Sequence, residues 1–148
     1  MSENQYLSPS AVEASREVRA VIRRLRRRIL KASEAEDITV GQATLLARLS
    51  DRGGVTASEL AAGEGVRHQS MTATIAPLAA LGLVERRPDP DDGRRLLITL
   101  TAEGRRRVED DRQLRKEWLA GQLEDKCTEE ERRAVIAAMA VLERLTRD

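Results

Sequence analysis

The sequence predicts a mainly α-helical protein with a small β-hairpin wing: a winged helix-turn-helix (HTH) domain between N- and C-terminal dimerisation helices. Three observations in the middle of the chain support this prediction. Thr56 and Glu59 have the spacing of a capping box, which starts a helix, and Gly63 and Gly65 then supply a turn. A second helical pattern ends at Gly82. Two short extended runs follow, separated by a stretch rich in Pro and Asp, as in a hairpin.

Composition narrows the class of protein. The 148 residues are 41% hydrophobic and 34% charged, with no Phe and a net charge of +1. The core must therefore be aliphatic, and any affinity for nucleic acid must come from local clusters of charge. A single Cys excludes an intrachain disulfide. No apolar run approaches the roughly 18 residues of a membrane span, and the first ten residues lack the features of a signal peptide. We expect a cytoplasmic protein with no membrane partner.

Residues 1–36 are predicted to contain an N-terminal helix that takes part in dimerisation. Ser8 and Pro9 offer a helix start, and Ser10 with Glu13 has the spacing of a capping box. The apolar residues that follow recur at helical spacing through about residue 32. They are Ala14, Val18, Val21, Ile22, Leu25 and Ile29.

Five of the six residues in the segment 23–28 are Arg. One interpretation is a solvated face whose long side-chain stems cover neighbouring apolar surface. The other is contact with phosphates or with an acidic partner. The sequence leaves both open.

Residues 37–101 form the predicted winged HTH domain. Thr39 with Gln42 opens a helix that reaches about residue 50, and Val55 is predicted to form a very short strand beside the wing. In the second helix of the motif, helical spacing turns one stripe inward: Met71, Ile75, Leu78 and Gly82. Pro77 lies inside this helix, so we expect the C-terminal half to be kinked or loosened, at a cost of about 3 kcal/mol.

Residues 102–148 are predicted to form two C-terminal dimerisation helices. Thr101 caps a long, charged helix in whose first half only Val108 and Leu114 look buried. Thr128 with Glu131 caps the last helix. That helix carries a narrow apolar seam made of Val135, Ala138, Met139, Leu142 and Leu145. The small winged domain cannot cover all the terminal apolar stripes, so we expect pairing with a second copy in a symmetric dimer.

Several motifs carry a resemblance to a known family. They are ITVGQATLL (38–46), VTASELA (55–61), GLVERRPDPDDGRRLLITLT (82–101) and the Gly104 that follows. On these residues the chain resembles the MarR family of winged HTH transcriptional regulators. The family's wing reads D-x-R followed by a short strand ending in L-T. Asp92, Arg94, Leu100 and Thr101 fill those places. The resemblance implies a homodimer held together mostly by the terminal helices.

The first turns of the second helix are the candidate base-reading surface. Gln69 can pair with adenine through two hydrogen bonds, and Ser70 can bond in either direction. Thr72 and Thr74 lie at the flanks of the same face, and the N-terminus of the helix offers free N–H groups to a phosphate. The alternative is that these polar residues are simply solvated. The chain departs from the family because no Lys or Arg occurs between positions 67 and 86, so we expect modest sequence discrimination.

The tip of the hairpin is the second candidate contact. By resemblance to the family, Arg94 enters the minor groove, Asp92 holds it in position, and Arg95 lies next along the strand. A narrow A/T-rich minor groove attracts Arg through its negative potential. The alternative is an ordinary surface ion pair, which contributes little. Arg86 and Arg87 are weaker candidates for contact with phosphates.

Together these observations predict a DNA-binding transcriptional regulator. We expect a repressor that binds a pseudo-palindromic operator as a homodimer and is released by a small aromatic or anionic effector, whose binding residues the sequence does not identify. The candidate DNA-binding residues are Arg67, His68, Gln69, Ser70, Thr72, Thr74, Asp92, Arg94 and Arg95. The alternatives are a winged-helix protein-interaction module and a ligand sensor with weak DNA reading. The sequence contains no catalytic, P-loop or dinucleotide motif and suggests no cofactor or metal, because one His and one Cys are too few for a typical zinc site.

Overall fold

The computed structural model describes residues 7–147. The expectation about a signal peptide concerned the first ten residues, and residues 1–6 lie outside the described part. The described chain is mainly helical with one two-stranded antiparallel wing, as the sequence predicts. In chain order the elements are α1 (Pro9–Ala32), α2 (Val40–Arg52), α3 (Ala57–Glu64), α4 (His68–Ala80), β1 (Val84–Pro88), β2 (Leu96–Leu100), α5 (Ala102–Lys126), α6 (Glu129–Glu143) and the 3-10 turn η1 (Arg144–Thr146). Among residues 7–147, no helix is both long and apolar enough to cross a membrane.

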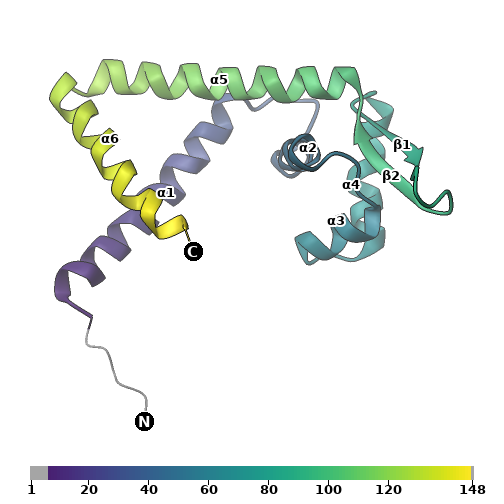
Figure 1. Cartoon of the computed structure of the whole chain (residues 1–148). Helices are drawn as coiled ribbons and strands as arrows, with labels where there is room; N and C mark the ends of the chain where they lie inside the picture. The colour runs from purple at the N-terminus through teal and green to yellow at the C-terminus, as the bar shows by residue number, and fades with distance from the viewer. Residues whose placement is uncertain (1–6, 148) are drawn as a thin grey trace, which may run out of the picture.

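The long helix α5 spans the molecule (Figure 1). The lobe formed by α2, α3, α4 and the wing lies at its N-terminal end, and α6 turns back from its C-terminal end. Helix α1 packs on α5 and runs away from it at an angle. The winged lobe and the two terminal helices are therefore separated along α5.

Capping residues set most helix starts where the sequence predicts them. Reciprocal capping boxes are formed by Thr39 with Gln42, by Thr56 with Glu59 and by Thr128 with Glu131. In each box the Thr hydroxyl and the side chain three residues later satisfy backbone N–H groups that the helix leaves unpaired.

The predicted capping box at Ser10 is wrong. The N-cap of α1 is Ser8, whose hydroxyl accepts a hydrogen bond from the Ala11 N–H at 3.2 Å. Pro9 is the first helical residue, and its fixed φ suits that position, so Ser10 is already inside the helix. The turn after α3 is also shorter than predicted. Gly63 remains helical, and Gly65 alone adopts the left-handed conformation, with φ of 66°.

One aliphatic core holds α2, α4 and β2 together. Its fully buried side chains are Leu46, Leu49, Ile75, Leu78 and Ile98. Met71 is also buried, which confirms three of the four predicted inward positions of α4. The fourth, Gly82, is exposed and lies beyond the end of the helix, and its φ of 73° is in the left-handed region. Helix α4 continues through Pro77 to Ala80, and the predicted kink stays a prediction.

The terminal helices leave much of their apolar surface uncovered in the single chain. The exposed residues include Val12, Val21, Ile22 and Leu25 of α1 and Val135, Ile136, Met139 and Val141 of α6. Leu114, which was predicted to be buried, is 49% exposed. The buried stripe of α5 runs through Gly104, Val108 and Asp111, and Leu114 lies about a quarter of a turn away from it.

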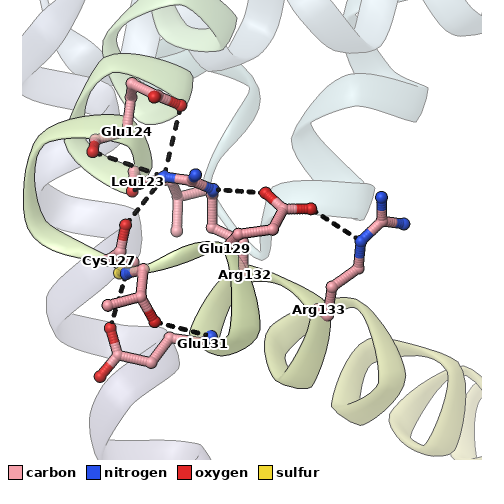
Figure 2. Close-up of polar contacts among 8 residues, drawn as sticks. Leu123, Glu124, Cys127, Glu129, Glu131, Arg132 and Arg133 are labelled. Carbon is pink, nitrogen blue, oxygen red and sulfur yellow. Dashed lines mark hydrogen bonds and ion pairs between the residues drawn. The ribbon is translucent and has the colours of Figure 1, made fainter.

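An arginine fixes the corner between α5 and α6 (Figure 2). The Arg132 guanidinium donates to the backbone carbonyls of Leu123, Glu124 and Cys127, at 3.3, 3.4 and 2.8 Å. It also pairs with the carboxylates of Glu124 and Glu129. Carbonyls at the end of a helix lack partners within it, so Arg132 caps α5 from the following helix.

A second arginine joins the winged lobe to α5. Arg107 donates two hydrogen bonds of 2.9 Å to Asp37, just before α2, and lies 3.5 Å from Asp111. Hydrogen bonding to Arg107 lowers the pKa of Asp37 below its usual value of 3.8. The same contact raises the pKa of Arg107.

Gly104 should tolerate no side chain. A Cβ at this position would lie 1.9 Å from the backbone oxygen of Leu83 and 2.9 Å from its carbonyl carbon. We predict that Gly104→Ala lowers the free energy of unfolding by about 3 kcal/mol or more in urea denaturation. The matched control is Gly121→Ala in the same helix, where nothing lies within 4 Å of the added Cβ. It should stabilise the protein by about 1 kcal/mol. Equal effects of the two substitutions would contradict this assignment.

The Asp37–Arg107 pair should contribute stability only above acidic pH. The folded-state pKa of Asp37 is lowered, so the contribution is present above the unfolded pKa and is lost as pH falls through the folded pKa. The Asp37 side chain is 45% exposed, so we predict that Asp37→Asn costs about 1 kcal/mol or less at about pH 7. The difference from wild type should vanish at about pH 2 in denaturation curves. A difference that is the same at both pH values would contradict the ion pair as its cause.

Candidate nucleic-acid interface

The first turn of α4 is exposed and has no side-chain cap. Arg67 occupies the N-cap position but makes no capping hydrogen bond, and His68, Gln69 and Ser70 are all exposed. The backbone N–H groups of this turn therefore have no partner within the helix and are available to an anion.

Thr72 and Thr74 are less available than their polarity suggests. Both are half-buried. Each hydroxyl donates to the backbone carbonyl four residues earlier: Thr72 to His68 and Thr74 to Ser70, both at 3.0 Å. What remains for an outside partner is chiefly the methyl group and the lone pairs of the hydroxyl oxygen.

The wing is a regular hairpin with an ordered tip. Its strands pair in register from Val84 opposite Leu100 to Pro88 opposite Leu96. At the tip, the Asp92 carboxylate accepts the backbone N–H of Arg94 at 3.1 Å, and the Asp92 carbonyl accepts the N–H of Arg95 at 3.0 Å. Asp92 therefore shapes the turn that carries Arg94 through the backbone of that residue.

The two arginines at the tip have different surroundings. Arg95 donates to Glu59 of α3 at 3.0 Å and lies 3.9 Å from Asp89. Arg94 has no ion pair within the described part of the chain. The pKa of Glu59 is lowered, first by the backbone N–H of Thr56, then by the hydroxyl of Thr56 and also by Arg95.

A groove of about 550 Å³ separates the start of α4 from the wing. Of the predicted site residues, the structure brings four together along it: His68, Thr72, Arg94 and Arg95. Ser70 and Thr74 instead line a smaller cavity of about 160 Å³ beside α2. Arg67, Gln69 and Asp92 line neither cavity.

The groove also contains residues that the sequence motifs did not single out. Thr56, Ala57 and Ser58, at the start of α3, form part of its wall, and so does Arg86 of β1. Arg86 was predicted only as a weaker phosphate contact. The alternation of side chains along β1 places Arg86 near the groove. The position of α3 depends on packing between segments that are distant in the sequence, so no local sequence pattern indicates that α3 lines the groove.

In the described part of the chain, the metal-ligating and thiol side chains do not form a further site. Among residues 7–147, no three His, Cys, Asp or Glu side chains are placed to hold a metal ion. Cys127 is a half-buried free thiol at the α5–α6 corner.

This architecture defines the class of protein. An HTH whose second helix exposes its first turn beside a hairpin wing is a winged HTH domain, a class that binds DNA.

Comparison with known proteins then defines the family. Residues 36–95 match the model described as the MarR family. The chain is 37% identical over 102 residues to an HTH-type transcriptional regulator of Mycobacterium tuberculosis, covering 69% of this chain and 71% of that protein. It is similar to wild-type MarR from E. coli, with a TM-score of 0.71, 26% identity and coverage of 90% and 96%. A transcriptional regulator protein from Pseudomonas aeruginosa gives a TM-score of 0.81, 28% identity and coverage of 95% and 97%.

The chain therefore belongs to the MarR family of HTH-type transcriptional regulators, a DNA-binding and non-enzymatic family.

Proposed function

We propose that this protein is a homodimeric repressor that places α4 in the major groove and the wing in the adjacent minor groove of a pseudo-palindromic operator. The observation that carries the proposal is the position of the uncapped first turn of α4 and of Arg94 beside one groove of the surface. Exposed N–H groups suit a phosphate. Arg94, which has no ion pair among residues 7–147, suits the negative minor groove.

The proposed contacts differ in kind. Gln69 and Ser70 read base edges, Arg67 and His68 contact phosphates, and Arg94 enters the minor groove. Thr72 and Thr74 contribute through their methyl groups, because their hydroxyl hydrogens are used within the helix. Asp92 stabilises the turn that carries Arg94 by accepting the backbone N–H of that residue.

The uncovered terminal helices support the homodimer. The exposed apolar faces of α1 and α6 would be covered by the same helices of a second copy, in an isologous interface. Two winged lobes would then read half-sites about one helical turn apart. A point mutant of S. aureus MepR, which shares this fold with a TM-score of 0.67 and 23% identity, has a structure bound to an oligodeoxyribonucleotide. Repression by blocking a promoter, and release by a small aromatic or anionic ligand, rest on membership of the family.

A protein-interaction module is the second candidate function. The observation that favours it is the exposed face of α4 beyond Ser70, which is small and apolar: Ala73, Ala76, Pro77 and Ala80. Such a face offers few hydrogen-bonding groups to bases and could instead pack against a protein.

Arg94→Ala separates the two functions. On a duplex that the wild-type protein selects from a random-sequence pool, we predict weaker binding and a loss of about 0.9 from the slope of log K against log salt, the value of one contact with the DNA backbone. The matched control is Arg133→Ala, an exposed arginine of α6. This helix turns back from the end of α5 that lies away from the wing. It should leave affinity and slope at wild-type values. If Arg94→Ala also keeps both values, or if no duplex is selected, the interaction module is favoured.

A further inference from the structure

Arg95 is held by acidic groups from α3 and from the hairpin loop. Its Nη2 donates to Oε1 of Glu59 at 3.0 Å, and its Nε lies 3.9 Å from Oδ2 of Asp89. Asp89 is largely buried for a charged side chain, at 13% exposed. The backbone of Arg95 is fixed as well, because its carbonyl accepts the Asp89 N–H at 2.9 Å and its own N–H donates to Asp92. Its neighbour Arg94 has a fixed backbone N–H, but its guanidinium has no such partner among the described residues.

The carboxylate that receives Arg95 is itself held rigidly. Oε2 of Glu59 accepts the Thr56 backbone N–H at 2.7 Å and the Thr56 hydroxyl at 3.0 Å, as part of the capping box of α3. The other oxygen, Oε1, is left for Arg95. The ion pair therefore joins the hairpin tip to the first turn of a helix in the core-bearing lobe, across 36 residues of sequence.

The wing needs such a connection. A two-stranded hairpin is marginally stable by itself. At the middle of β2, Val55 pairs with Ile98 through two backbone hydrogen bonds of 3.2 and 2.7 Å. Toward the tip, the Glu59–Arg95 ion pair connects the hairpin to α3. Without it, these contacts bond the hairpin to the lobe only at the middle of β2, and the tip can move relative to α4.

We propose that Arg95 is a positioning residue for the wing and not itself a DNA contact. It holds the hairpin tip at the distance from α4 at which Arg94 reaches the minor groove while α4 lies in the major groove. This inference rests on the proposed function and replaces the DNA-contacting role that the sequence suggested for Arg95. It assigns opposite tasks to two adjacent arginines, one bound to protein and one available to DNA.

The size of the effect follows from the fraction of molecules whose wing is correctly placed. Apparent affinity falls in proportion to that fraction. The pair is about half exposed on both sides, so its loss is expected to leave the wing correctly placed in about one molecule in three to five. Binding should then weaken about three- to fivefold with no change in the number of ions released.

The test compares Glu59→Gln, Arg95→Gln and the double variant with wild type on the duplex selected by the wild-type protein. The amide introduced by Glu59→Gln keeps an oxygen that can accept the Thr56 N–H, so the helix cap is retained. Each single variant and the double should bind about three- to fivefold more weakly, with non-additive losses and a wild-type salt slope. The control is Asp91→Asn, which removes a nearby tip carboxylate that has no ion pair in the described chain. It measures the gain in DNA affinity expected whenever a negative charge near DNA is removed.

Direct contact of Arg95 with DNA gives the opposite pattern. Glu59→Gln would then release Arg95 and tighten binding as much as Asp91→Asn or more. Arg95→Gln would lower the salt slope by about 0.9. Either result overturns the proposal. Hydrogen exchange on the free protein is an independent measurement: the wing amides of Asp89 and Arg95 should exchange faster in both single variants, and unchanged rates also overturn it.

If the proposed function itself is wrong, the variants give a different set of results. If the wild-type protein selects no duplex, or if Arg94→Ala leaves the salt slope unchanged, both proposals fall. If Arg94→Ala lowers the slope and Arg95→Gln does so as well, DNA binding through the wing stands and only the positioning role of Arg95 is wrong.

Discussion

The structure depends on an aliphatic core that packs one face of α4 against α2 and β2. Ile75 and Leu78 are 0% exposed, and they pack with Leu46, Leu49 and Ile98. Burying each such side chain contributes about 1.5–3 kcal/mol, and the core contains no Phe to add aromatic area. Because one core includes both a helix of the HTH and a strand of the wing, α4 and the strands of the wing are fixed relative to each other. The exposed first turn of α4 is a consequence of its buried opposite face.

Polar contacts extend this rigidity beyond the core. The close approach of Gly104 to Leu83 and the Asp37–Arg107 pair fix the winged lobe to α5. At the other end of α5, Arg132 fixes the turn into α6. In the proposed dimer, the separation of the two α4 helices would be set by these contacts together with the pairing of the apolar faces of α1 and α6. The fit of the protein to DNA would thus depend on contacts that lie far from the DNA-facing surface.

The sequence predicts this fold wherever the cause is local. The capping boxes at Thr39, Thr56 and Thr128 depend on a spacing of three residues, and the inward stripe of α4 depends on helical periodicity. The three boxes and three of the four stripe positions were confirmed for that reason; the fourth position, Gly82, lies beyond the helix. The box at Ser10 was wrong because two nearby serines compete to cap one helix, and Pro9 favours the first.

The parts that the sequence did not predict depend on distant segments. Arg107 lies 70 residues from Asp37, and Arg95 lies 36 residues from Glu59, so neither pair has a signature in the chain. The motif drew attention to the wing tip, but it could not show that Arg94 and Arg95 have different surroundings. The prediction that Leu114 is buried was wrong, because apolar character alone does not say which side of a helix meets the lobe.

Hydroxyl-radical footprinting of the selected duplex tests the central claim, that two rigid winged lobes related by a two-fold axis grip DNA through α4 and the wing. The account predicts a symmetric footprint, with two protected half-sites about one helical turn apart, each flanked by protection of an outer minor groove. A single asymmetric protected segment, or half-sites without protection of the flanking minor grooves, would contradict it.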